Sequence, residues 1–410
     1  MDKYIVTMLG EKDHGKSTLI GNLLIATGST TDERVREARV KGKRWEPAYI
    51  LDSFSEEREN EMTIDTTRAE LVYKQRMFEL IDVPGHLELI KNMMSGASNG
   101  DFAVLMVSVK KGEGFRPQTR RHLFLSQMFG IKALAVAVNK MDIVDYDERV
   151  FERAKREVGD YLRSINFDKP VFFVPVSAYN NENLVSNSGN MGWYKGLPLA
   201  GLLMDFAKRY YKKAKSKSGG EGVRAIVQDA VDTDGSKALF CVLYNGTVRV
   251  GDTVRVEPDE ARARVKRLHL KGRSVRSASA HSNIALVLDK DVDVGRGSMI
   301  YGSSVRPHRK GTFTARMFVI NGIRSAEAKR LFIRTNNNDI PLKSMRIEST
   351  LSPVTGKRSR GGGSIATNDS ATVSISLARD YPLERYEEHN ELGRFALYRG
   401  EEFVGVGIVE

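Results

Sequence analysis

The sequence contains a single cysteine among its 410 residues, Cys241. One cysteine cannot form an intrachain disulfide, and metal sites built on cysteine clusters are excluded as well. Its neighbours on both sides are apolar, which indicates a buried structural thiol and not a reactive one. No apolar run approaches the length of a membrane-spanning helix, and the N-terminus lacks the basic-then-apolar order of a signal peptide. These absences predict a cytoplasmic protein.

The composition is otherwise ordinary for a folded chain, with 41% hydrophobic and 28% charged residues. The length allows two to four domains with ample core. The charge is uneven, because 64 Lys and Arg face 52 Asp and Glu and leave a net charge of +12. This excess favours a polyanionic partner, RNA above all, although simple solubility would also account for it. Neither DNA nor a membrane is an expected partner, and nothing requires more than a monomer.

The most informative segment, Gly10 to Thr18, has the pattern G-x-x-x-x-G-K-[ST]. It follows an apolar run, residues 4–9, and precedes a helix-like segment, residues 18–26, which is the context that this pattern requires. Its glycines let backbone N–H groups point inward around an anion, and the helix N-terminus adds positive potential. We expect Lys16 to reach the β- and γ-phosphates of a nucleoside triphosphate and Ser17 to coordinate Mg²⁺. The expected phosphate-site residues are Asp13, His14, Gly15, Lys16, Ser17 and Thr18.

A second short motif, Asp82-Val83-Pro84-Gly85, follows an apolar run at residues 77–81. A carboxylate at a strand end can hold Mg²⁺, directly or through water, and the backbone N–H of Gly85 can contact the γ-phosphate. Alone the pattern is weak, since most such tetrapeptides are only turns. Its position after the phosphate loop strengthens the interpretation of Asp82 as a metal ligand.

A third motif, Asn139-Lys140-Met141-Asp142, closes an apolar run at residues 133–138. The Asp142 carboxylate can accept two hydrogen bonds from guanine N1–H and its exocyclic amine, an arrangement that adenine cannot match. The stem of Lys140 can lie over the base, and Asn139 can tie this loop to the phosphate loop. Ser177 and Ala178 follow another apolar run and fit a backbone contact to guanine O6. The expected nucleotide is therefore GTP.

Apolar strands alternate with helical segments over residues 1–214, with helices expected at 117–130 and 149–164. This alternation predicts an α/β domain with a mostly parallel sheet, in which ligands bind at the carboxyl ends of the strands. All the nucleotide motifs lie at such ends.

Residues 215–222 lack periodicity and are interpreted as a linker. Short strands separated by turns follow, in two groups at 223–305 and 306–410. Two small antiparallel β-barrels fit this spacing better than one large sandwich.

The three motifs resemble those of translational GTPases, within the branch of elongation factor Tu and elongation factor 1-alpha. Residues 57–65 resemble switch I of that branch, and residues 392–396 resemble a segment of its third domain. The resemblance implies a GTPase domain followed by two barrels. It also implies that Thr63 coordinates Mg²⁺, that His86 orients or activates the attacking water, and that Asp13 supports the phosphate loop. The partners that the resemblance implies are tRNA or the ribosome and a nucleotide exchange factor.

The chain departs from this family at three positions near the nucleotide. Lys12 stands where the family usually has valine, and Glu61-Met62 stand for a glycine-isoleucine pair. In the family, that valine and isoleucine form an apolar gate around the catalytic histidine, so we expect the gating of His86 to differ. In the third domain, residues 333–338 replace an expected His- and Thr-rich segment. These departures indicate a divergent paralogue.

Several basic clusters are candidates for contact with RNA. They comprise residues 208–213; Arg262, Arg264, Lys266, Arg267, Lys271, Arg273 and Arg276; Arg306, His308, Arg309 and Lys310; and residues 357–360. A regulatory GTPase subunit of ATP sulfurylase shares the three-domain architecture and is the alternative function. A scaffold that binds GTP and scarcely hydrolyses it is a further one, which the presence of Thr63 and His86 disfavours.

Overall fold

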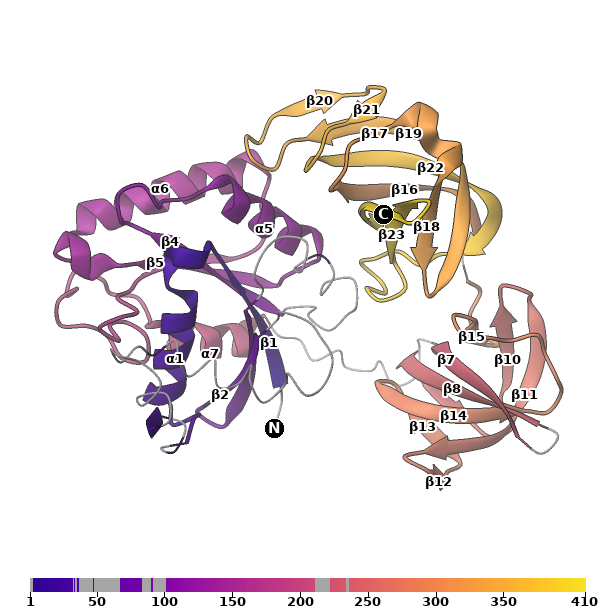
Figure 1. The fold of residues 1–410 in the computed structure, drawn as a ribbon. Helices are drawn as coiled ribbons and strands as arrows, with labels where there is room; N and C mark the ends of the chain where they lie inside the picture. Colours follow the sequence, from indigo (N-terminus) through magenta and orange to yellow (C-terminus); the bar gives the residue numbers. More distant parts are fainter. Residues whose placement is uncertain are drawn as a thin grey trace. The chain divides into compact units, whose positions relative to one another are not determined.

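The computed structural model describes residues 3–31, 33, 35–36, 47, 67–82, 90, 101–210, 222–233, 236–307 and 309–410. The chain divides into two compact units (Figure 1). The first unit is Met1–Tyr211 with Leu351–Arg358, and the second is Lys212–Thr350 with Ser359–Glu410. Among the described residues, no helix is long and apolar enough to cross a membrane.

The first unit is built on a six-stranded sheet of order β2–β3–β1–β4–β5–β6. All its neighbouring strands run parallel except β2 and β3, which are antiparallel. The strands are β1 (Lys3–Leu9), β2 (Thr67–Tyr73), β3 (Arg76–Asp82), β4 (Phe102–Ser108), β5 (Ala133–Asn139) and β6 (Val171–Pro175). Every residue of β4 and β5 is buried, as expected for continuous apolar runs in a sheet that is covered on both faces.

Helices cover both faces of this sheet (Figure 1). Helices α1 (Lys16–Ala26) and α7 (Leu199–Arg209) share one hydrophobic core with the strands. Helices α5 (Pro117–Met128) and α6 (Glu148–Ser164) lie on the opposite face. Two short 3₁₀ helices, η1 (Lys12–His14) and η2 (Met141–Val144), follow β1 and β5. The α/β architecture expected from the sequence is confirmed.

The segment Leu351–Arg358 belongs to this first unit although it lies far along the chain. The Arg120 guanidinium of α5 donates to the carbonyl of Val354 at 3.0 Å. The Tyr161 hydroxyl of α6 donates to the carbonyl of Pro353 at 2.7 Å. These bonds hold the segment against the two helices.

The second unit begins with a barrel whose strands follow the order β10–β15–β7–β8–β14–β11–β12, closed by pairing of β10 with β11. A short two-stranded sheet, β9 with β13, adds to it. The strands are β7 (Arg224–Thr233), β8 (Ser236–Asn245), β9 (Thr247–Arg249), β10 (Thr253–Glu257), β11 (Ala261–Leu270), β12 (Arg273–Ser274), β13 (Ser277–Ser279), β14 (Ser282–Leu288) and β15 (Met299–Gly302).

The last barrel has the strand order β18–β23–β24–β16–β22–β19–β20, closed by pairing of β18 with β19. A second pair, β17 with β21, lies beside a 3₁₀ helix, η3 (Ser325–Arg330). The strands are β16 (Arg309–Val319), β17 (Ile323–Arg324), β18 (Leu331–Thr335), β19 (Asn338–Leu351), β20 (Arg358–Arg360), β21 (Ser364–Ile365), β22 (Ser370–Pro382), β23 (Arg394–Arg399) and β24 (Glu402–Val409). The two antiparallel barrels predicted from the turn spacing are therefore present.

Each barrel has its own hydrophobic core, and that of the last barrel also includes Met299 and Tyr301 of the first. The amide of Asn338 donates to the carbonyl of Gly297 at 2.9 Å, across the junction. A Cβ at Gly297 would lie 2.1 Å from the Asn336 carbonyl oxygen, so the asparagine turn needs a glycine opposite it. The asparagine segment that departs from the family pattern thus joins the two barrels.

Candidate nucleotide-binding site

The phosphate loop connects β1 to α1 and takes its shape from two glycines. Gly10 has φ 137° and Gly15 has φ 88°, values that other residues rarely adopt. A Cβ on Gly10 would lie 2.9 Å from the Met106 carbonyl oxygen, and one on Gly15 would lie 2.6 Å from Nδ2 of Asn139. Both positions therefore need glycine for backbone conformation and for space. The loop ends at the N-terminus of α1, where Ser17 and Thr18 are half-buried.

Lys16 is buried inside this loop. Its ammonium donates to the carbonyls of Gly10, at 2.8 Å, and Glu11, at 2.9 Å. Burial lowers the pKa of Lys16, and the nearby carboxylates of Asp82, Glu11 and Asp13 oppose that shift. The sequence thus places one desolvated cation at the centre of an anion-binding loop.

Asp82 ends β3 and is half-buried, near enough to Lys16 for the two charges to interact. Burial raises the pKa of the Asp82 carboxyl, and the positive charge of Lys16 opposes this. Its Oδ1 atom is buried without a hydrogen-bond partner among the described residues. An unpaired buried carboxylate oxygen is costly unless something binds it, so Asp82 fits the Mg²⁺ that the nucleotide chemistry requires. The described residues contain no cluster of three or more His, Cys, Asp or Glu.

His14 is buried in the phosphate loop, and its ring contacts the neighbouring strand. Nδ1 donates to the carbonyl of Met106 in β4 at 3.0 Å, which fixes the proton on that nitrogen. Burial lowers the pKa of His14, with the Met106 bond opposing. The lowered pKa favours the neutral ring, whose bond to Met106 joins the phosphate loop to β4.

The loops that follow β5 and β6 form the other half of the site. The Asn139 amide donates to the His14 carbonyl at 2.8 Å, and its oxygen accepts from the Ala178 backbone N–H at 2.9 Å. The Ser177 hydroxyl donates to Asp142 at 2.6 Å. The structure thus brings Asn139, Asp142, Ser177 and Ala178 together beside the phosphate loop.

Lys140 has a left-handed backbone, with φ 67°, between Asn139 and Asp142. Its ammonium lies 2.6 Å from an Oε atom of Glu113, in the loop that follows β4.

Asn22 of α1 is also new to the site, because its amide donates to the carbonyl of Ala178 at 2.5 Å. Neither Glu113 nor Asn22 was predicted from the sequence. Glu113 could have been found from its place after the carboxyl end of a central strand, and Asn22 from its polarity within an apolar helix.

Several expected site residues lie outside what the structure describes. Thr63, Gly85 and His86 belong to undescribed residues, as do Glu61 and Met62. The side chain of Lys12 is likewise not described. Their assigned roles remain predictions, that of Gly85 from its motif and the others from the resemblance. Asp13 is exposed on η1.

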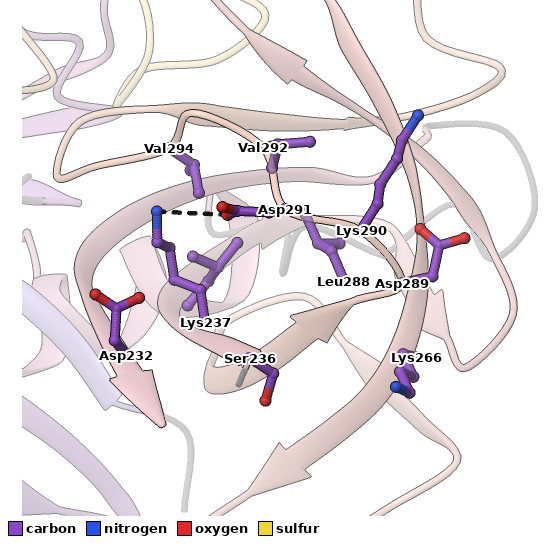
Figure 2. A pocket seen from close by; sticks show the side chains of 11 residues that line it. Asp232, Ser236, Lys237, Lys266, Leu288, Asp289, Lys290, Asp291, Val292 and Val294 are labelled. Atoms are coloured by element: carbon purple, nitrogen blue, oxygen red, sulfur yellow. Dashed lines mark ion pairs between the residues drawn. The ribbon is translucent and has the colours of Figure 1, made fainter. Parts of the chain in front are cut away.

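A second concavity lies in the first barrel, with a volume of about 490 Å³ (Figure 2). Its apolar lining comes from four residues, Leu239, Leu288, Val292 and Val294. Charged side chains of both signs surround them, and the Lys237 ammonium lies 3.7 Å from Asp291. Neither histidine nor cysteine lines this pocket, which is separate from the nucleotide site.

The basic candidates for RNA contact divide into exposed and structural groups. Arg309 lies 2.7 Å from the fully buried Glu257 and stabilises the fold, whereas Arg209 is exposed and pairs with Asp205 of its own helix at 2.7 Å. By contrast, the basic side chains on β11 to β13 are largely exposed, and Arg249 of β9 adds to them through its pairing with Ser277. These exposed residues of β9, of β11 to β13 and of the turns between them are here together called the basic face: Arg249, Arg262, Arg264, Lys266, Arg267, Lys271, Arg273 and Arg276. Arg306 and residues 357–360 are exposed elsewhere, and His308 is not described.

Comparison with known proteins agrees with the geometry of the site. A family model described as "Elongation factor Tu GTP binding domain" matches residues 2–229. A second, described as "GTP-eEF1A C-terminal domain-like", matches residues 312–410.

Several proteins named elongation factor 1-alpha match along nearly the whole chain. Elongation factor 1-alpha of Pyrococcus abyssi is 32% identical over 411 residues, which cover 96% of this chain and 94% of that protein. Its counterpart in Sulfurisphaera tokodaii is 31% identical over 420 residues, covering 98% and 95%. That of Thermoplasma acidophilum is 32% identical over 402 residues, covering 95% and 93%. With its phosphate and guanine loops assembled on an α/β sheet, the chain belongs to the elongation factor Tu and elongation factor 1-alpha family and is a divergent GTPase of that family.

Proposed function

We propose that this GTPase is a switch that acts in translation, on tRNA or on the ribosome, and that its GTP form binds the partner that its GDP form releases. The binding of GTP is supported chiefly by the hydrogen bond between Asn139 and the His14 carbonyl, which fixes the guanine loop against the phosphate loop. The role in translation is supported by the names of the relatives, which are elongation factors.

In this proposal the chain's own groups divide the work of binding. Lys16 neutralises the phosphates, and Asp142, oriented by Ser177, accepts the two guanine hydrogen bonds. Ser17, Thr63 and Asp82 are the residues that would hold Mg²⁺, which when bound stabilises the negative charge on the transferring phosphoryl group. Gly85 contacts the γ-phosphate and His86 positions the attacking water.

The basic face is the proposed RNA contact of the first barrel. Its arginines and lysines are spread over β9, β11, β12 and the turns around them, which suits an extended phosphate backbone better than a compact ligand. Arg262 and Arg264 alternate on β11 with the buried Ala263 and Val265, so their side chains share one outer surface. Phosphate contacts of this kind position an RNA without reading its sequence.

The test is protection of aminoacyl-tRNA from deacylation by the protein bound to a non-hydrolysable GTP analogue. We expect protection with the analogue and none with GDP. Replacing Arg262 and Arg264 by Gln should weaken the complex and lower the slope of log affinity against log salt by about 0.7–0.9 for each phosphate that is no longer neutralised. Arg330→Gln and Arg346→Gln, at two exposed arginines of the other barrel, provide the matched control. Tight GTP binding without any protection would contradict a carrier role for bulk tRNA and leave the ribosome as the partner to be tested.

A further inference from the structure

The carboxylate of Glu113 holds two ammonium groups at the edge of the guanine-side loops. Lys140 Nζ lies 2.6 Å from one oxygen, and Lys110 Nζ lies 3.0 Å from the other. The Lys140 and Glu113 side chains are 24% and 13% exposed, whereas that of Lys110 is 57% exposed. The bond to Lys140 is therefore the better shielded of the two and less weakened by solvent.

The loop that carries Glu113 is fixed by its own hydrogen bonds. The Glu113 N–H donates to the carbonyl of Lys110 at 3.0 Å, and Ser108 forms a bridge with Gly114. Nε of Arg116 donates to the Glu113 carbonyl at 2.9 Å. The carboxylate is consequently presented from a backbone that is held on both sides and begins at the carboxyl end of β4.

Lys140 is fixed on its own side by its neighbours. Asn139 is bonded to the phosphate loop and to Ala178, and Asp142 is bonded to Ser177. Because these bonds fix the backbone of Lys140, the residue keeps freedom only in its side-chain torsions. Ordering a long lysine side chain costs conformational entropy. A carboxylate that takes up the ammonium before the ligand arrives removes part of that cost.

Glu113 is ionised over the whole working range of pH. Burial opposes its ionisation, but hydrogen bonds from Lys140, Ser108 and Lys110 outweigh burial and lower the pKa of Glu113 to about 2. The ion pair with Lys140 is thus present whenever the protein is folded near neutrality.

We propose that Glu113 is a positioning residue for guanine-nucleotide binding, which holds the Lys140 side chain so that its stem is ordered over the base. This inference rests on the proposed base-binding role of Asn139, Lys140 and Asp142. Glu113 touches no ligand itself, so it acts on the base half of the nucleotide and not on the phosphates.

The experiment compares GDP with inorganic triphosphate, which has no base. Glu113→Ala should increase the dissociation rate of GDP roughly tenfold, because the preorganisation of Lys140 is lost. The affinity of the variant for inorganic triphosphate, measured by competition, should equal that of the wild type. Glu113→Gln, which keeps the shape and loses the charge, should have a smaller effect of the same kind. Lys110→Met should leave GDP dissociation unchanged, because it removes only the exposed partner.

A double-mutant cycle separates positioning from damage to the loop. In a Lys140→Met background the stem remains and the ammonium is gone, so adding Glu113→Ala should produce no further loss. Equal weakening of GDP and triphosphate, or a full loss in the Lys140→Met background, would overturn the proposal, as would an unchanged GDP dissociation rate. If the wild type fails to prefer guanine nucleotides over adenine nucleotides, the base-site assignment itself is wrong, and the two failures are thereby distinguished. Thermal unfolding of each variant verifies that it folds.

Discussion

The side chain of Asn139 joins the two halves of the nucleotide site, because its amide donates to the carbonyl of His14 at 2.8 Å while its oxygen accepts from the N–H of Ala178. Both partners are backbone groups and all three residues are buried. Asn139→Ala would leave a buried carbonyl and a buried N–H unpaired, at about 1–3 kcal/mol each. We expect a lower free energy of unfolding by that order, measured in urea, and weaker binding of GTP and GDP alike. A variant with wild-type stability and affinity would show that the two loops are held by other contacts.

Gly15 needs both its backbone conformation and its lack of a side chain. Gly15→Ala would force a Cβ to within 2.6 Å of Asn139 Nδ2 at φ 88°. We expect roughly 5- to 150-fold weaker GDP binding by calorimetry, from about 1–3 kcal/mol of strain at the loop. Gly28 is the matched control, since it has φ 67° and no neighbouring atom within 4 Å of a Cβ. Gly28→Ala should lower the melting temperature and leave nucleotide affinity intact.

The buried, neutral His14 makes stability depend on pH. Its pKa in the folded protein is lowered by burial from the ordinary 6.5, so the unfolded chain binds the extra proton more readily. Stability should therefore fall as the pH drops below 6.5, by at most about 1.4 kcal/mol per pH unit from this group. The charges of Glu11 and Glu113 oppose the shift and that of Lys16 adds to it. Thermal unfolding between about pH 8 and pH 5 should show a shallower loss for His14→Asn, whereas parallel curves would contradict this assignment.

Cys241 is 2% exposed in the core of the first barrel, and burial raises the pKa of its thiol to about 12. Thiolate is the reactive form, so the native protein should resist iodoacetamide at about pH 8. Mass spectrometry should detect no adduct in buffer and one adduct in denaturant. Rapid alkylation of the native protein would mean that the barrel opens locally.

Local motifs predicted which residues lie together at the candidate site. The loop glycines, Lys16, Asp82 and the segment from Asn139 to Asp142 lie at or just after the carboxyl ends of parallel strands, and this topology alone brings those ends together. Glu113 was not predicted, because its pairing with Lys140 depends on the path of the connection between β4 and α5 and not on a motif.

Other elements escaped prediction for physical reasons of their own. The hairpin of β18 and β19 was not predicted individually; its asparagine turn, Asn336 to Asn338, also serves the junction between the barrels. Strand β2 was not predicted, because it forms an antiparallel hairpin with β3 at the sheet edge, and no helix separates the two strands.

Reversal of base preference tests the assignment of the guanine site most directly. The Asp142 carboxylate accepts from the N1–H and the exocyclic amine of guanine, whereas the amide introduced by Asp142→Asn would donate an N–H that suits the C2 carbonyl of xanthine. The measurement is the Kd of GDP and of XDP for both proteins. We expect the wild type to prefer GDP by at least about 10³-fold and the variant to prefer XDP, since a polar group left unpaired in the site is strongly disfavoured. An Asp142→Asn variant that binds GDP as tightly as the wild type would contradict the assignment of this site.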